Sequence, residues 1–79
     1  MRISDQKKEQ ISRLIAAGEN LDPEDLDVFY QWINASYKTL AFHRTLQGWF
    51  DECCRSSCDS INMRAYVGVW ILRMSLRDF

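Results

Sequence analysis

Residues 61–79 read INMRAYVGVWILRMSLRDF and, at helical spacing, carry apolar side chains on two separate sides. One row consists of Ile61, Ala65, Gly68, Leu72, Leu76 and Phe79. The second row, roughly opposite, consists of Met63, Val67, Trp70 and Met74. A helix that is apolar on both sides has to be covered on both sides. We therefore predict a central helix, with its own bundle against the first row and an oligomer interface or another protein against the second.

The middle of this segment, YVGVWI at residues 66–71, also fits a buried strand when it is considered alone. A single strand would have no partner elsewhere in the chain, and good helix formers such as Met63, Leu72 and Met74 flank it. We therefore interpret residues 61–79 as one helix.

Residues 23–41 are predicted to form the main core helix. Asp22 is a good N-cap, Pro23 suits the first helical position, and Leu21 is placed to pack on Leu26. The predicted core face consists of Leu26, Phe29, Tyr30, Ile33, Tyr37 and Leu40. Val28 and Trp32 lie four residues apart on the opposite side, and we predict that they belong to an interface.

Two further helices complete the predicted bundle. Residues 5–17 place Ile11, Leu14 and Ile15 in a narrow apolar row, with Ser4 as a cap and Gly18 at the end. A short third helix presents Leu46, Trp49, Phe50 and Cys53 on one face. The prediction is an all-α single domain over residues 1–79, a small bundle of three to four helices.

Size and charge restrict the class of partner. A chain of 79 residues is close to the size at which one core is only just sufficient, so we predict a homo-oligomer. The formal net charge is −1 and no basic stripe is present, which disfavours nucleic acid. A helix-turn-helix across residues 41–45, with Arg44 and Gln47 facing a groove, is the remaining DNA-binding alternative.

The sequence also bears on the compartment. Its longest apolar run, residues 65–72, is far shorter than the ~20 residues of a membrane-spanning helix, and the first residues carry no apolar signal segment. The odd number of cysteines, three, favours reduced thiols. We expect a cytoplasmic protein without membrane association.

The turn before the last helix is the candidate ligand site. A helix N-terminus exposes unpaired N–H groups. Two arginines and three serines accompany it here: Arg55, Ser56, Ser57, Ser60 and Arg64. Such donors suit a phosphorylated small molecule or a nucleotide. The alternative is an ordinary polar turn in which Asp59 caps the last helix.

Metal binding and catalysis find less support. Cys53, Cys54, Cys58 and His43 nominally supply four zinc ligands, but two of the cysteines are adjacent and no CxxC or HxxxH spacing occurs. The one histidine has no neighbouring acid or nucleophile with which to form a catalytic relay. We predict no metal, no other cofactor and no enzymatic activity.

Binding is therefore the predicted activity. The leading hypothesis is an inhibitor or adaptor that acts through an aromatic protein–protein surface, for example a viral or mobile-element accessory protein that blocks a host pathway. Its predicted interface residues are Val28, Trp32, Met63, Val67, Trp70 and Met74. The alternative is a homo-oligomer that sequesters a phosphorylated small molecule or nucleotide at residues 55–64.

Overall fold

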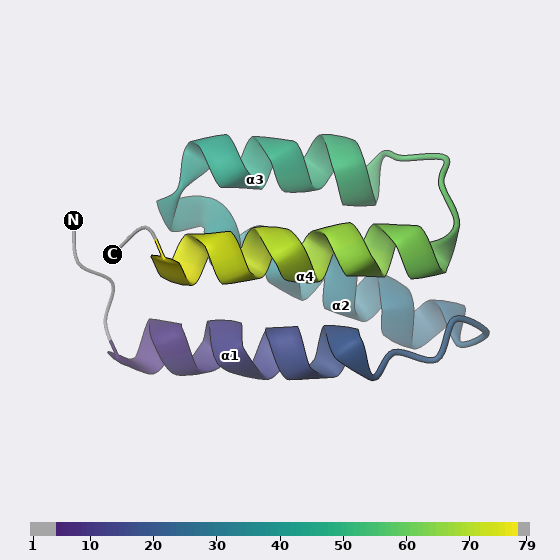
Figure 1. Ribbon diagram of the computed structural model, residues 1–79, viewed down its shortest axis with the longest axis horizontal. Coiled ribbons are helices and arrows are strands. Elements are labelled where there is room, and N and C mark those ends of the chain that lie inside the picture. Colours follow the sequence, from purple (N-terminus) through teal and green to yellow (C-terminus); the bar gives the residue numbers. More distant parts are fainter. Residues whose placement is uncertain (1–4, 78–79) are drawn as a thin grey trace.

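The computed structural model describes residues 5–77, and every regular element within this range is helical. The elements are α1 (Asp5–Glu19), α2 (Leu26–Thr39), the 3-10 turn η1 (Leu40–Phe42), α3 (Arg44–Phe50), the π-helical turn η2 (Asp51–Arg55) and α4 (Ile61–Arg77). Figure 1 shows α4 between α3 and α1, with α2 behind them. The predicted all-α fold, with the last helix at its centre, is confirmed.

The centre of the core is built on α4. Its buried positions recur at helical spacing: Arg64, Ala65, Gly68, Val69, Ile71, Leu72 and Ser75. Fully buried side chains of the other α-helices complete the core: Ile11 of α1, Phe29 and Ile33 of α2, and Leu46 and Phe50 of α3. Burying a side chain of this size stabilises the fold by roughly 1.5–3 kcal/mol.

The first predicted row of α4 agrees with this core in its middle and less so at its ends. Ala65, Gly68 and Leu72 are buried as predicted. Ile61 and Leu76 are only partly buried against the core, and Phe79 lies outside the described residues. The row therefore identifies the correct side of the helix.

Trp32 lies in the core and not at an interface, which corrects the prediction for that residue. Its side chain is 4% exposed, and its Nε1 donates a hydrogen bond to the Leu14 carbonyl oxygen at 2.8 Å. The indole fills space left by two glycines. A Cβ on Gly18 would lie 2.5 Å from Trp32 Cζ2, and a Cβ on Gly68 would lie 2.7 Å from Cη2. Helical spacing within α2 could not reveal this space, because α1 and α4 create it.

The buried face of α2 is consequently turned relative to the predicted one. The buried residues of this segment are Phe29, Trp32, Ile33, Ser36 and Leu40. Leu26 and Tyr30, both assigned to the core from spacing, are exposed, while Tyr37 is partly buried. The physical reason is that α2 packs against both α1 and α4, so its apolar contact is centred on Trp32.

α2 begins three residues later than predicted. Asp25 is the N-cap, and its Oδ1 accepts a hydrogen bond from the Val28 N–H at 3.2 Å. Asp22 Oδ1 instead accepts from the Glu24 N–H at 2.9 Å, in a turn that contains Pro23. Proline suits the second position of such a turn as well as the first position of a helix. The two aspartates are equally good caps by residue type, so the sequence did not distinguish them.

α3 continues directly into the π-helical turn η2, which shifts the register of its apolar face. Leu46 and Phe50 are buried, and the next buried residue is Cys54. Trp49 and Cys53, predicted for the same face, are exposed. A π turn closes its hydrogen bond over one more residue than an α turn does. Cys54 therefore takes the place predicted for Cys53.

α1 runs two residues past its predicted end. Gly18 is helical and buried beneath Trp32, so it does not end the helix; the predicted cap, Ser4, lies outside the described residues. α1 has 15 residues and α4 has 17. Within residues 5–77, no helix combines the length and the apolar character needed to cross a lipid bilayer.

Candidate protein-binding surface

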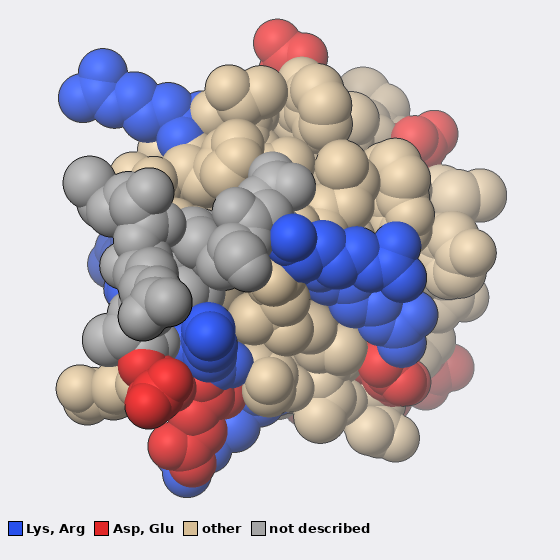
Figure 2. Space-filling model, turned by 60° about the vertical axis from the view of Figure 1, so that its left-hand side comes forward, with Lys and Arg blue, Asp and Glu red and all other residues tan. Residues whose placement is uncertain are grey.

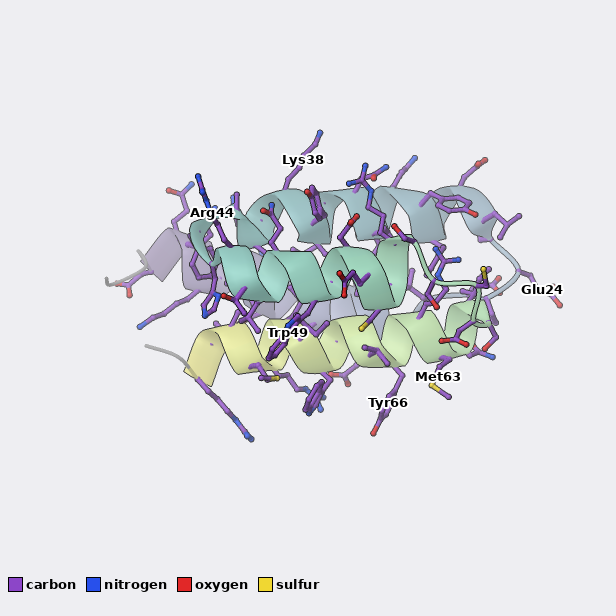
Figure 3. All side chains as sticks on the ribbon, turned by 90° about the horizontal axis from the view of Figure 1, so that it is seen from above. Glu24, Lys38, Arg44, Trp49, Met63 and Tyr66 are labelled. Atoms are coloured by element: carbon purple, nitrogen blue, oxygen red, sulfur yellow. The ribbon has the colours of Figure 1, made fainter. Side chains whose placement is uncertain are left out.

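Large apolar side chains gather on the outer side of α4. Met63, Tyr66 and Trp70 follow one another at spacings of three and four residues and are 52, 74 and 56% exposed. Trp49 of α3, 46% exposed, adds a further ring. Figure 3 shows Met63, Tyr66 and Trp49 directed to the side of the molecule that faces away from α2. We call these four residues the aromatic face.

The aromatic face agrees with only part of the predicted interface. Met63 and Trp70 belong to it, whereas Val67 and Met74 are partly buried against the core and offer less surface to a partner. Val28 is exposed, but it lies on α2, behind α4 in Figure 1.

Two members of the face, Tyr66 and Trp49, were not predicted as surface residues. A signal for Tyr66 was present in the sequence, because it lies three residues after Met63 and four before Trp70.

A groove of about 440 Å³ adjoins the aromatic face, between α4 and the end of α1. Its apolar lining includes Leu21, Ile61, Ala65, Tyr66, Val69 and Trp70. Glu19 and Arg73 also line it, and Arg73 Nη2 lies 2.6 Å from Glu19 Oε1 in an exposed ion pair. With Asn62, these residues give the groove a lining of both apolar and polar side chains.

The two ends of the molecule differ in charge. The acidic end, at the α1–α2 loop and the start of α2, comprises Asp22, Glu24, Asp25 and Asp27. The basic end comprises Arg44 at the start of α3, Arg77 at the end of α4, and Lys7 and Lys8 near the start of α1, where Asp5 also lies. Figure 3 places Glu24 and Arg44 at opposite ends of the long axis. Figure 2 looks obliquely towards the basic end and shows Lys and Arg side chains among uncharged residues, with groups of Asp and Glu side chains beside some of them.

Arg64, a predicted ligand-binding residue, instead holds the protein's own backbone. It is buried, and its Nε donates to the Cys54 carbonyl oxygen at 2.6 Å while Nη2 donates to the Arg55 carbonyl oxygen at 3.1 Å. Its guanidinium also lies 5.0 Å from the centre of the Phe29 ring. These contacts satisfy carbonyls at the end of η2, where a helix leaves acceptors unpaired. Arg64 lies three residues after Ile61 and four before Gly68, so spacing indicated the inner side of the helix, although it did not indicate which carbonyl oxygens Arg64 binds.

The other members of the predicted anion pocket also have partners within the chain. Arg55 lies 3.6 Å from Asp51 Oδ1 and 4.5 Å from the centre of the Tyr37 ring. Ser57 Oγ donates to Asp59 Oδ2 at 3.0 Å and accepts from the Asp59 N–H. The Ser56 N–H donates to the Asp51 carbonyl oxygen at 2.7 Å.

The cap of α4 differs from the prediction. Ser60 Oγ accepts from the Met63 N–H at 3.2 Å, so Ser60, and not Asp59, caps the helix. The structure thus brings residues 55–64 into one turn, and their contacts favour the alternative of a self-capped polar turn. Anion binding there stays a prediction.

The cysteines and the histidine are placed separately. Cys54 is buried, and burial, with a smaller effect from Cys53, raises the pKa of its thiol to about 12. Cys53 and Cys58 are exposed, and His43 Nδ1 accepts from the Leu46 N–H at 3.3 Å as the N-cap of α3. Across residues 5–77, no group of three His, Cys, Asp or Glu side chains is arranged to hold a metal ion.

Comparison of the chain with protein-family models, with curated proteins and with solved structures found no match.

Proposed function

We propose that this chain is a non-catalytic protein-binding module, an inhibitor or adaptor, whose aromatic face covers another protein chain. The observation that carries the proposal is the exposure of Trp49, Met63, Tyr66 and Trp70 on one side of the molecule. Large apolar side chains exposed together on one side of a small domain often mark an interaction site. Tryptophan and tyrosine also dominate the binding energy of many protein interfaces.

Two side chains of types that serve nucleophilic or acid–base chemistry, Cys54 and His43, have structural roles here, which supports a non-catalytic function. Cys54 is buried with a raised pKa, which disfavours the reactive thiolate. The Nδ1 atom of His43 is engaged as a helix cap. Neither residue lines the groove beside the aromatic face.

Site-specific photocrosslinking tests this proposal. A photoreactive phenylalanine analogue replaces Tyr66 in one variant and Tyr30, which is 50% exposed on α2, in a matched control. In the cells that naturally produce the protein, we expect a discrete protein adduct at position 66 and none of the same mass at position 30. Trp70→Glu should abolish the adduct while leaving the circular dichroism spectrum unchanged. A folded protein that gives no adduct at position 66 would contradict the proposal.

A further inference from the structure

We infer that the aromatic face has a specific occupant, a second copy of this chain bound antiparallel across it. The inference rests on the proposed function, because it names a partner of the same face. The dimer would be a resting form, in which each copy covers the other's aromatic face until a different protein competes for it.

Symmetry gives the first argument. A two-fold interface uses the same surface of both copies, so that surface must complement itself. The exposed residues of α4 lie along the helix from Met63 to Trp70. A two-fold axis that lies in the plane of the interface, perpendicular to the axis of α4 and close to Tyr66, would lay α4 of one copy antiparallel on α4 of the other. Apolar side chains would then meet apolar side chains along the middle of the contact.

Charge gives the second argument, and it selects the antiparallel arrangement. The acidic end and the basic end lie at opposite ends of the long axis, as Glu24 and Arg44 show in Figure 3. In the antiparallel dimer, the basic end of the second copy lies beside the acidic end of the first copy. The acidic end of the second copy then lies beside the basic end of the first. A parallel arrangement would bring like charges together, which opposes binding.

Size gives the third argument. The broad side of the molecule in Figure 1 extends 36 by 21 Å, so only a contact that covers most of this side would reach the roughly 800 Å² that each partner contributes to a standard interface. The groove beside Tyr66 and Trp70 adjoins this contact and provides room for an apolar side chain of the second copy. A domain of this size also gains from the additional apolar burial.

The first experiment measures mass in solution by sedimentation velocity over a range of protein concentrations. We expect the parent to approach twice the 9.4 kDa of one chain. The double variant Tyr66→Glu/Trp70→Glu should sediment as a monomer with an unchanged circular dichroism spectrum. The matched control Tyr30→Glu should remain a dimer. A parent that stays monomeric at the highest soluble concentration, or a double variant that stays dimeric, overturns the inference.

The second experiment tests the antiparallel arrangement by reversing charge at one end at a time. The acidic-end variant is Glu24→Lys/Asp27→Lys, and the basic-end variant is Arg44→Glu/Arg77→Glu. Each alone removes the attraction between opposite charges at both junctions of the dimer, because one of the two ends at each junction is altered, so its dissociation constant should rise about tenfold or more at low salt. In a mixture of the two, the heterodimer regains one junction between an unaltered acidic end and an unaltered basic end, which neither variant forms with itself. Native mass spectrometry should then show heterodimers well above their statistical share.

A matched mixture controls for attraction caused by net charge alone. It combines Glu9→Lys/Glu52→Lys with Lys38→Glu/Arg13→Glu, which make the same changes in net charge at other exposed positions. We expect no excess of heterodimers in this mixture. An equal excess in both mixtures would overturn the antiparallel arrangement.

The outcomes separate this inference from the proposed function. A monomeric parent that still gives a heterologous adduct at position 66 overturns the dimer and leaves the protein-binding function standing. A monomeric parent with no adduct overturns both. An adduct at position 66 with the mass of two copies supports the dimer, provided that the charge-reversal mixture also gives excess heterodimers.

Discussion

The inner and outer sides of α4 use the same residue types for opposite purposes. Trp32 packs on the inner side and is 4% exposed, whereas Trp70 on the outer side is 56% exposed. Arg64 is buried and holds two backbone carbonyls, whereas Arg73 makes an exposed ion pair with Glu19. Residue type alone therefore does not decide whether a tryptophan or an arginine of α2 or α4 stabilises the fold or remains available for binding. The neighbouring backbone decides it. Two glycines leave space for the Trp32 ring, and two carbonyl oxygens accept hydrogen bonds from Arg64.

The largest contrast is expected between the two tryptophans. Trp32→Ala should lower the free energy of unfolding by about 3–5 kcal/mol, because it empties the centre of the core and removes the hydrogen bond to Leu14. Trp70→Ala should change it by less than about 0.5 kcal/mol in the monomer. Urea denaturation of dilute protein measures both values. Similar losses in the two variants would show that the outer side also contributes to the fold.

The two arginines provide the next contrast. Arg64→Met keeps much of the side-chain volume but leaves the Cys54 and Arg55 carbonyl oxygens without their donor. We expect a loss of about 2–3 kcal/mol, since buried polar groups without partners are costly. Arg73→Met should cost at most about 1 kcal/mol, as is typical of exposed ion pairs. Equal losses, measured by thermal and urea unfolding, would contradict the role assigned to Arg64.

Substitutions at Gly68 and Gly48 test whether the inner side of α4 needs a glycine to make room for Trp32. Gly68→Ala should destabilise the fold by about 1–3 kcal/mol, because its Cβ would lie 2.7 Å from Trp32 Cη2 and 3.0 Å from Phe50 Cε2. Gly48→Ala, where the added Cβ meets nothing within 4 Å, should stabilise α3 by up to about 1 kcal/mol. Changes in the same direction for both variants would show that helix propensity, not space for Trp32, governs position 68.

The last contrast concerns pH. Burial raises the pKa of Cys54 from 9.0 to about 12, so above pH 9 the thiol ionises in the unfolded chain before it ionises in the folded one. Stability should therefore fall as the pH rises from about 9 towards 12. Cys54→Ala should make this decline shallower than the parent's, while Cys53→Ala, at an exposed position, should leave the slope almost unchanged. Urea unfolding at several alkaline pH values measures the slopes.

Sequence periodicity predicted the parts of this molecule that depend on one helix at a time. It gave the number and type of the helices, and the inner row of α4 at Ala65, Gly68 and Leu72. The buried positions of Trp32 and Arg64 were not predicted, because each depends on a contact with residues 10 or more positions away. Among the surface residues, Met63 and Trp70 were predicted from the second apolar row of residues 61–79. Trp49 was not predicted to be exposed, because its spacing from Leu46 also fits a buried face, and the packing of α3 against α4 buries the neighbouring Phe50 instead.

Because of where the tryptophans lie, their intrinsic fluorescence can report separately on the core and on the surface of the molecule. The chain has three of them, Trp32, Trp49 and Trp70, and only the first is shielded from water. Acrylamide should therefore quench the red-shifted emission of Trp49 and Trp70 and spare the blue-shifted emission of Trp32. Covering the aromatic face would protect the quenchable emission, whereas unfolding would expose all of it. One fluorescence titration can thus distinguish an occupied surface from a disrupted core, without any attached dye.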